Sequence, residues 1–367
     1  MPGNKARQRI VEKARRVVVK VGTNAICDDA GRINRRVVTS LAEQISSIMR
    51  RGISVTLVAS GAIGAGMGEL DIPSRPKAIP KLQAVAAVGQ GQLMRTFHDA
   101  FARHDVKVAQ VLLTRDDFDD RSRYLNIRNT LAALAGFPAL PIINENDTVA
   151  VDEIRFGDND VLAALVANML GADLLVFLTA VDGVMKDGQV LEFIEQVDGE
   201  AAALVTGEKS RLGSGGMGSK IQAAGMVTRA GEAAVIANAR TPNVLTRLLA
   251  GEAVGTVFVP AERRMGSRRR WIGQASRPAG RLVIDDGAVG ALQRSGKSLL
   301  PSGIRAVFGK FAKGSVVAVV DSSGTEVARG LTNYSSDQID RIKGCAQHRS
   351  QRFLATSLMT KSFTATT

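Results

Sequence analysis

Two lysines in this chain occupy positions that are unfavourable for a lysine unless its side chain contacts a bound anion. Lys20 lies between valines in the run VVKVG. Burying an ammonium group there is costly unless it meets an anion; the alternative is an edge-strand lysine that faces water. Lys220 follows SGGMGS in the first turn of a predicted helix. A positive charge there is unfavourable against the helix dipole. Contact of Lys220 with a phosphate explains this position better than the alternative, a charged surface loop.

Two polar clusters precede another predicted helix. NEND (144–147) follows the apolar run PALPII, and GDND (157–160) comes ten residues later. Asp158 or Asn159 could simply cap the helix that follows, but capping explains one of these residues and not both clusters. Their amide and carboxylate groups could hold an amino group or, indirectly, a magnesium ion.

Glycine-rich segments are the third candidate. SGAIGAGMG (60–68) follows an apolar run but has neither G-x-G-x-x-G spacing nor a Walker lysine. Its glycines could form a backbone-amide cradle for an anion at a helix N-terminus, or serve a tight turn with close helix packing. GKS (296–298) is excluded as a Walker loop, because Ala291 replaces the required earlier glycine and a helix precedes it.

An α/β sheet has to position these segments. Apolar, β-branched runs alternate with helical stretches through the first 260 residues. Strands are predicted at 16–21, 54–59, 108–113, 138–143, 174–179 and 233–237, and helices at 34–50, 81–103, 119–135, 159–170, 218–230 and 243–250. This order predicts a mostly parallel sheet covered on both faces. Such sheets bind ligands at the carboxyl ends of their strands, where Lys20, Ser60, Asn144 and Thr179 stand.

Composition changes near Ala261. The run ERRMGSRRRW (262–271) predicts a basic, exposed connector, and the alternating residues after it predict a small β-rich domain with helices at 288–294 and 336–343. We therefore expect five parts, at 1–15 (a basic N-terminal extension), 16–260 (the α/β domain), 261–275 (a basic linker), 276–352 (the β-rich domain) and 353–367 (an atypical tail).

Bulk properties narrow the class of protein. With 367 residues, 45% of them hydrophobic and 23% charged, the chain is typical of a globular protein of two domains. Its two cysteines and three histidines form no metal-binding or disulfide pattern. The net charge of +13 favours anionic partners, or serves solubility. No run approaches the length of a membrane span and the N-terminus is no signal peptide, so we expect a cytoplasmic protein without membrane contact.

In their order, the motifs VVKVGTNA, SGAIGAG, QAVAAVGQ, VLLTR, LNIRNT, PIINENDTVA, FGDND and SGGMGSK resemble the amino-acid kinase family. The pattern is similar to the members that phosphorylate L-glutamate, and the segment from RRRWIG onward resembles their appended PUA domain. The resemblance implies an α/β fold, with a mostly parallel sheet sandwiched by helices, plus a small C-terminal PUA-like domain. It implies ATP-dependent phosphorylation of the L-glutamate γ-carboxylate to L-glutamyl 5-phosphate, the first step of proline biosynthesis, with ATP as co-substrate and Mg²⁺.

The resemblance also assigns roles to residues. Lys20 and Lys220 would contact the phosphates as catalytic groups, and Asp160 would hold them in place. The glutamate site would comprise Ser60, Gly61, Asn144, Asp147, Asp158 and Asn159. The ATP site would comprise Lys20, Gly22, Thr179, Ala180, Ser214, Gly215, Gly216, Met217, Gly218, Ser219 and Lys220. Proline as a feedback inhibitor and a homo-oligomer, dimer or tetramer, are implied as well.

Two of the chain's departures from the family pattern bear on its function or fold. Ala180 stands where the family usually has Asp, and Asp182 nearby could substitute in part. After Gly344 the tail matches no family motif, so the small domain either leaves an unpaired sheet edge or pairs its tail differently.

Two other functions stay open. One is another amino-acid kinase, acting on acetylglutamate, aspartate, carbamate or a nucleotide. The other is an RNA-binding protein with a vestigial kinase domain, in which the arginines at 263–270 supply positive charge.

Overall fold

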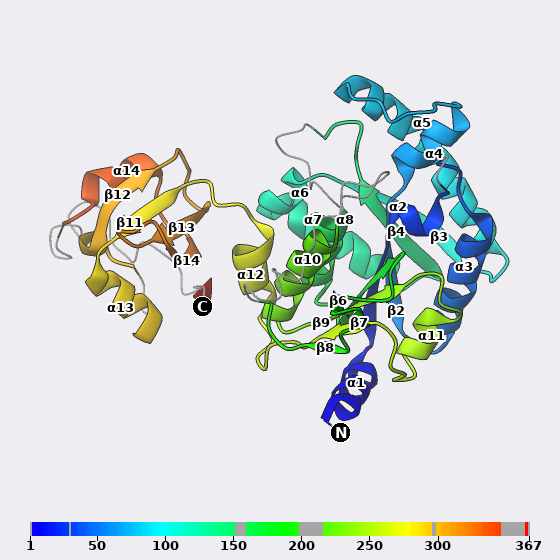
Figure 1. The fold of residues 1–367 in the computed structure, drawn as a ribbon. Coiled ribbons are helices and arrows are strands. Elements are labelled where there is room, and N and C mark those ends of the chain that lie inside the picture. The colour runs from blue at the N-terminus through cyan, green and yellow to red at the C-terminus, as the bar shows by residue number, and fades with distance from the viewer. Residues whose placement is uncertain are drawn as a thin grey trace. The chain divides into compact units, whose positions relative to one another are not determined.

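The computed structural model describes residues 2–28, 31–150, 159–197, 216–295, 299–345 and 364–365. The chain divides into two units, Met1–Arg264 and Met265–Thr367. Figure 1 shows the helices and strands of each unit. The finer five-part division expected from the sequence stays a prediction.

An eight-stranded sheet with the order β3-β4-β2-β1-β5-β9-β10-β8 organises the first unit. Its strands are β1 (Arg16–Val21), β2 (Ser54–Ala59), β3 (Lys107–Leu113), β4 (Ala139–Glu145), β5 (Leu174–Thr179), β8 (Phe193–Ile194), β9 (Ala233–Asn238) and β10 (Thr256–Phe258). β1 runs parallel to β2 and β5, β4 runs parallel to β2 and β3, and β9 runs parallel to β5. β10 is antiparallel to β9. The predicted mostly parallel sheet is therefore confirmed.

Helices cover both faces of this sheet. The described helices of the first unit are α1 (Pro2–Lys13), α2 (Thr23–Ile26), α3 (Arg35–Arg50), α4 (Ala62–Glu69), α5 (Ile79–Ala102), α6 (Asp116–Asp119), α7 (Arg121–Leu134), α8 (Asn159–Leu170), α10 (Met217–Arg229) and α11 (Val244–Leu248). A short hairpin of β6 (Met185–Lys186) and β7 (Gln189–Val190) follows β5.

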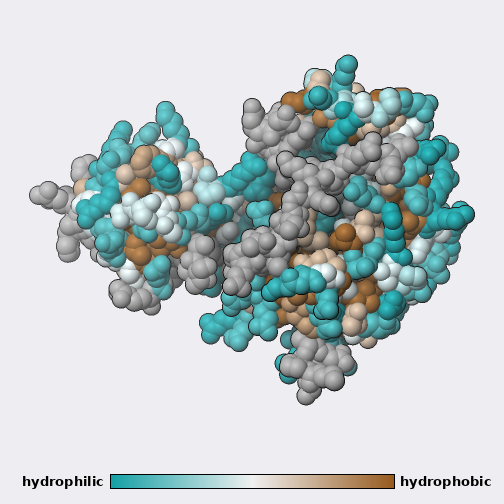
Figure 2. All heavy atoms as spheres, viewed as in Figure 1, coloured by the Kyte–Doolittle hydropathy of each residue, from teal (hydrophilic) through white to brown (hydrophobic). Residues whose placement is uncertain are grey.

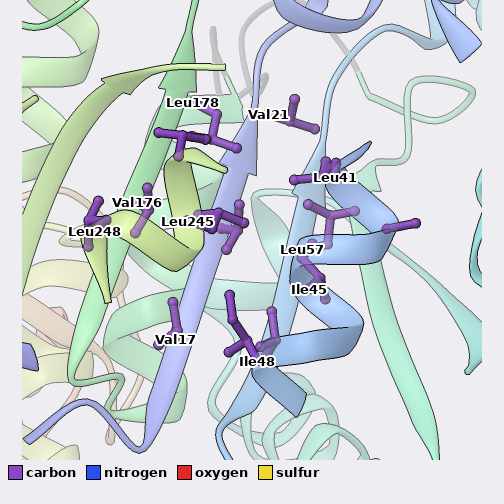
Figure 3. Packing of buried hydrophobic residues seen from close by; sticks show 14 of the residues in the cluster. Val17, Val21, Leu41, Ile45, Ile48, Leu57, Val176, Leu178, Leu245 and Leu248 are labelled. Carbon is purple, nitrogen blue, oxygen red and sulfur yellow. The ribbon is translucent and has the colours of Figure 1, made fainter. Parts of the chain in front are cut away.

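The side chains of β1 alternate between the two faces. Val17, Val19 and Val21 belong to the core that α3, α5 and α11 share with the sheet. Figure 3 shows side chains of α3 and α11 pointing toward β1, β2 and β5, among them Leu41, Ile45, Ile48, Leu245 and Leu248. Lys20 therefore falls on the opposite face, against which α8 packs.

The glycine-rich segment after β2 differs from the expected loop, because Ala62–Glu69 form α4. A Cβ atom on Gly66 would lie 1.9 Å from the Val85 carbonyl oxygen, and one on Gly89 would lie 1.8 Å from the Ala62 carbonyl oxygen. These glycines let the backbones of α4 and α5 touch. At Gly66 the close-packing alternative therefore explains the glycine.

The structure refines two expectations for the first unit. The helix predicted at 119–135 is α7, which begins at Arg121 because the Asp120 side chain caps it by accepting from the Arg123 amide at 2.8 Å. The basic N-terminal extension contains α1, whose Arg7 is buried and donates to the Val254 carbonyl at 3.1 Å. Burial lowers the pKa of Arg7, while the charge of Glu192 acts in the opposite direction.

The second unit has a five-stranded sheet with the order β12-β11-β13-β14-β15. Its elements are α12 (Ser267–Arg270), a π-helical turn (Trp271–Ala275), β11 (Arg281–Ile284), α13 (Asp286–Ser295), a 3₁₀ turn (Pro301–Gly303), β12 (Ile304–Phe308), β13 (Val316–Val320), β14 (Glu326–Leu331), α14 (Ser336–Ile342) and β15 (Thr364–Ala365). A separate core, which includes Leu282, Val317 and Ile339, holds it together. The expected separate β-rich domain is confirmed.

Two features of the second unit refine the sequence analysis. Arg270 and Trp271 are buried, so the end of the basic run is not the exposed connector that we expected. β15 pairs with β14, with Thr364 opposite Arg329 and Ala365 opposite Ala328. The tail therefore pairs differently from the family pattern at these two residues; the rest of the predicted tail lies outside the described residues.

Hydrophilic residues cover much of the face seen in Figure 2, with apolar residues in smaller areas between them. Among the described helices, none is long and apolar enough to span a membrane.

Candidate active site

The carboxyl ends of β1, β2 and β4 bring Lys20, Ser60 and Asn144 to one edge of the first sheet. Lys20 is in register with Val58, and Val58 is in register with Ile143. Ser60 and Asn144 therefore stand one or two residues beyond the level of Lys20. The start of α8 adds its first two residues to this edge.

Asp160, the second residue of α8, is fully buried and binds two lysines. The Nζ atom of Lys20 lies 2.5 Å from Asp160 Oδ1, and the Nζ atom of Lys220 lies 2.9 Å from Asp160 Oδ2. Lys20 is 3% exposed and Lys220 is 7% exposed. The hydroxyl of Ser219 donates to Asp160 Oδ2 at 2.8 Å. Among the three ionic side chains, positive charge exceeds negative charge by one, which suits the binding of a further anion.

Asn159, the first residue of α8, connects this cluster to the ends of β2 and β4. Its side-chain amide donates to the Ala59 carbonyl at 3.1 Å, to the Ser60 hydroxyl at 3.0 Å and to Asn144 Oδ1 at 2.8 Å. The buried Asn144 in turn donates from Nδ2 to Gln90 Oε1 at 2.8 Å. Polar side chains from β2, β4, α5 and α8 therefore form one network beside the lysines.

Comparison with known proteins assigns this arrangement to a family. Residues 15–238 match the amino acid kinase family, and residues 280–354 match the PUA domain. The glutamate 5-kinase of Caldanaerobacter subterraneus subsp. tengcongensis is 46% identical over 340 residues, which cover 91% of each chain. The chain belongs to the amino acid kinase family.

A second curated relative and a solved structure support the same family and fold. The glutamate 5-kinase of Geobacter sulfurreducens is 44% identical over 352 residues, covering 94% of this chain and 93% of that protein. The solved carbamate kinase from Giardia lamblia bound to AMP-PNP shares the fold, with 21% identity and a TM-score of 0.50, over 68% of this chain and 99% of that chain.

The first part of the expected ATP site lies at the end of β1. The amide of Gly22 donates to the Leu178 carbonyl at 3.2 Å. A Cβ atom on Gly22 would lie 3.7 Å from the Nζ atom of Lys20. Glycine therefore leaves space beside this ammonium group.

The second part of that site lies at β5 and α10. Thr179 is half-buried at the end of β5, and Ala180 after it is exposed. Gly216 is the N-cap of α10, and its carbonyl accepts from Ser219 at 3.1 Å. Met217 and Gly218 form the first turn of α10. Ser214 and Gly215 lie outside the described residues.

The other residues expected to bind glutamate are placed less completely. Gly61 is the N-cap of α4, with a φ of 111° that favours glycine. Asp147 is half-buried in the turn after β4. Asp158 lies outside the described residues. Asp182, which could replace the missing family carboxylate, accepts from Asn238 at 2.9 Å.

Cys27 is a buried thiol beside this edge of the sheet. A Cβ atom on Gly61 would lie 3.4 Å from its Sγ atom. Burial, with a smaller contribution from the charge of Asp28, raises the pKa of Cys27 to about 12. A thiol with that pKa stays neutral at physiological pH and is a poor nucleophile.

Gln90 is the site residue that sequence reasoning missed. It ends the motif QAVAAVGQ, but a glutamine inside a helix carries no local signal about its partner. Its contact with Asn144 joins residues 54 positions apart.

Proposed function

We propose that this protein transfers the γ-phosphoryl group of ATP to the γ-carboxylate of L-glutamate, forming L-glutamyl 5-phosphate for proline biosynthesis. The observation that carries the proposal is the buried Lys20–Asp160–Lys220 cluster, with the network of Asn159 beside it. The curated relatives are named glutamate 5-kinases, and their alignments cover more than nine-tenths of this chain. They favour glutamate over the acceptors of other family members.

The acceptor needs no general base. A γ-carboxylate has a pKa of about 4.3 and is already ionised at neutral pH. The difficulty is instead electrostatic, because this anion has to approach the polyanionic end of ATP. In phosphoryl transfer, positioning and charge stabilisation supply most of the catalysis. Buried ammonium groups at the carboxyl edge of the sheet meet that requirement.

On the ATP side, Lys20 and Lys220 would bind the phosphates and stabilise the charge of the transferring group. Asp160 would keep both ammonium groups at fixed positions between β1 and α10. Gly22 would let a phosphate approach Lys20, and the start of α10 with Thr179 and Ala180 would hold the nucleotide.

On the glutamate side, the free acceptor of Asn159 is informative. Its Oδ1 atom is buried and has no hydrogen-bond partner among the described residues. An ammonium group is a donor without acceptor capacity, so the α-ammonium of glutamate would satisfy this atom. Ser60, Gly61, Asn144, Asp147 and Asp158 would complete the pocket.

A magnesium ion would enter as part of the ATP complex. Among the described residues, no three or more His, Cys, Asp or Glu side chains form a group that could hold a metal ion. Mg²⁺ with nucleotides binds mainly to phosphate oxygens and water rather than to a protein cage. When bound, the ion neutralises phosphate charge.

The test is ADP release from the purified protein with ATP and magnesium, with L-glutamate, acetylglutamate, aspartate and UMP compared as acceptors. Hydroxylamine traps an acyl phosphate as a hydroxamate. We expect ADP release and hydroxamate formation with L-glutamate. A folded protein that releases no ADP with L-glutamate would refute the proposal, and activity with another acceptor would reassign the substrate.

Regulation, assembly and location belong to the same proposal. Proline would compete with glutamate for its pocket, because both are five-carbon amino acids; equal activity with and without millimolar proline would exclude this. A dimer or tetramer would be detected by light scattering after size exclusion, and a monomer would contradict it. A cytoplasmic location stays an expectation.

A further inference from the structure

We propose that Gln90 is a positioning residue of the glutamate site, which acts by holding the side chain of Asn144 in one orientation. This inference rests on the proposed glutamate kinase function and adds a residue of α5 to it. Gln90 is half-buried and accepts from Nδ2 of Asn144 at 2.8 Å. Asn144 is 3% exposed, so its amide has little access to water as a replacement partner.

The orientation of the two asparagines follows from backbone groups that cannot exchange roles. The Ala59 carbonyl can only accept, so the atom of Asn159 that faces it at 3.1 Å has to be the amide nitrogen. The Glu145 amide can only donate, so the atom of Asn144 that faces it at 2.8 Å has to be Oδ1. The Nδ2 atom of Asn144 then points to Gln90 and needs an acceptor there.

Gln90 supplies that acceptor from a separate helix. With Asn144 held in this way, its Oδ1 atom accepts from Asn159 at 2.8 Å. Asn159 then keeps its own Oδ1 atom available for a donor on the substrate. Without the acceptor on Gln90, the buried Nδ2 atom of Asn144 loses its partner, which favours rotation of the side chain. Rotation would break the contact that orients Asn159.

Two variants of Gln90 separate the acceptor from the bulk of the side chain. Gln90→Met keeps a similar length but removes the acceptor, and Gln90→Glu keeps an acceptor oxygen. The matched control is Gln92→Met on the same helix, because the side chain of Gln92 makes no hydrogen bond within the described part of the chain. Initial rates give KM for glutamate, KM for ATP and kcat for each protein, and thermal melting reports stability. A crystal structure of each variant gives the position of the Asn144 side chain without depending on turnover.

We expect Gln90→Met to raise KM for glutamate about tenfold, in line with the loss of one buried hydrogen bond. KM for ATP should stay within about twofold, and Asn144 should be rotated in the crystal. Gln90→Glu should recover most of the affinity for glutamate, and Gln92→Met should behave as the unchanged protein.

Three results would overturn the positioning role: an unchanged KM for glutamate in Gln90→Met, an equal rise of both KM values with a lower melting temperature, or no recovery in Gln90→Glu. If the unchanged protein shows no glutamate-dependent activity, the proposed function fails. The position of Asn144 in Gln90→Met then decides the role of Gln90 by itself.

Discussion

Replacing Asp160 by asparagine tests the centre of the proposed mechanism. The substitution keeps the size of the side chain and an oxygen that can accept from Ser219, but it removes the negative charge that Lys20 and Lys220 share. Two buried ammonium groups are then left without their carboxylate. We expect lower stability, a much lower turnover number and a stronger response to added anions.

The size of the effect follows from the distances. Unit charges separated by 2.5 Å and 2.9 Å attract by about 6 kcal/mol each at an effective dielectric constant of about 20. Desolvation offsets much of this attraction, and removing one partner of a buried ion pair typically costs about 3–5 kcal/mol. Domains are stable by about 5–15 kcal/mol, so Asp160→Asn should still fold and melt roughly 10 °C lower.

The assay combines thermal melting, with and without inorganic phosphate, and glutamate-dependent ADP release. Because an anion binds to the native lysine pair and not to the unfolded chain, it raises stability by mass action. Phosphate should therefore raise the melting temperature of Asp160→Asn more than that of the unchanged protein. The turnover number should fall at least about a hundredfold, as for loss of a preorganised charge-stabilising contact.

Asp173→Asn is the matched control. Asp173 accepts from the amides of Arg15 and Arg16 at 2.9 and 2.8 Å and pairs with Arg264 at 3.0 Å, at the opposite end of β5 from Thr179. It should lose stability without changing the turnover number or the phosphate response. Asp160→Asn that melts within about 2 °C of the unchanged protein and keeps its rate would refute the reasoning.

Four further tests, made with substitutions or with thiol reagents, address separate parts of the structure. Lys220→Ala should lower kcat about a thousandfold or more while the protein still folds, because Asp160 keeps Lys20 as a partner; near-normal ADP release would show that the lysine is misassigned. Ala180→Asp should raise kcat/KM for ATP, since it restores the carboxylate that the family usually has at this position; an unchanged kcat/KM would show that residue 180 does not contact the nucleotide. Gly89→Ala should lower the free energy of unfolding by about 3 kcal/mol through overpacking. A Cβ atom on Gly91 meets nothing within 4 Å, so Gly91→Ala should raise the free energy of unfolding by about 0.5–1 kcal/mol. Equal denaturation midpoints for the two variants would contradict this. With its pKa raised to about 12, Cys27 should resist thiol reagents at pH 8 until the protein unfolds, and labelling of native Cys27 at pH 8 would contradict its burial. The thiol of the unfolded chain ionises near pH 8.5. The contribution of Cys27 to the free energy of unfolding should therefore fall as the pH rises from about 8.5 toward 12.

Three of the strands that carry the site could be predicted residue by residue, whereas β4 (Ala139–Glu145, predicted at 138–143) extends through Asn144. β1, β2 and β5 have the predicted bounds, and so does α8. β1 and β2 are short runs rich in β-branched residues, followed by Gly22 and Ser60, and β5 is an apolar run that ends at Thr179, so local composition indicates these strands. The rule that parallel strands bind ligands at their carboxyl ends then selected Lys20 and Ser60.

The remaining features depend on contacts between distant segments. Glycine has low helix propensity, so α4 could not be recognised in SGAIGAGMG without its neighbour α5. The burial of Trp271 depends on packing within the second unit, and no local sequence pattern indicates it. The shared ion pair of Asp160 joins residues 140 and 60 positions away, at Lys20 and Lys220. Composition indicated that the lysines need an anion, but only the family resemblance, and no local pattern, pointed to Asp160 as the carboxylate.

Two consecutive residues of α5, Gly89 and Gln90, connect helix packing to the proposed glutamate site. Gly89 sets how closely α5 approaches α4, because its missing side chain leaves room only for the Ala62 carbonyl. Gln90, the next residue, reaches Asn144 from that position. A larger residue at 89 would push α5 outward and lengthen the Gln90–Asn144 contact, while Gly91 faces open space and would not. If the proposed glutamate site is correct, the loss of stability expected for Gly89→Ala should therefore be accompanied by a higher KM for glutamate.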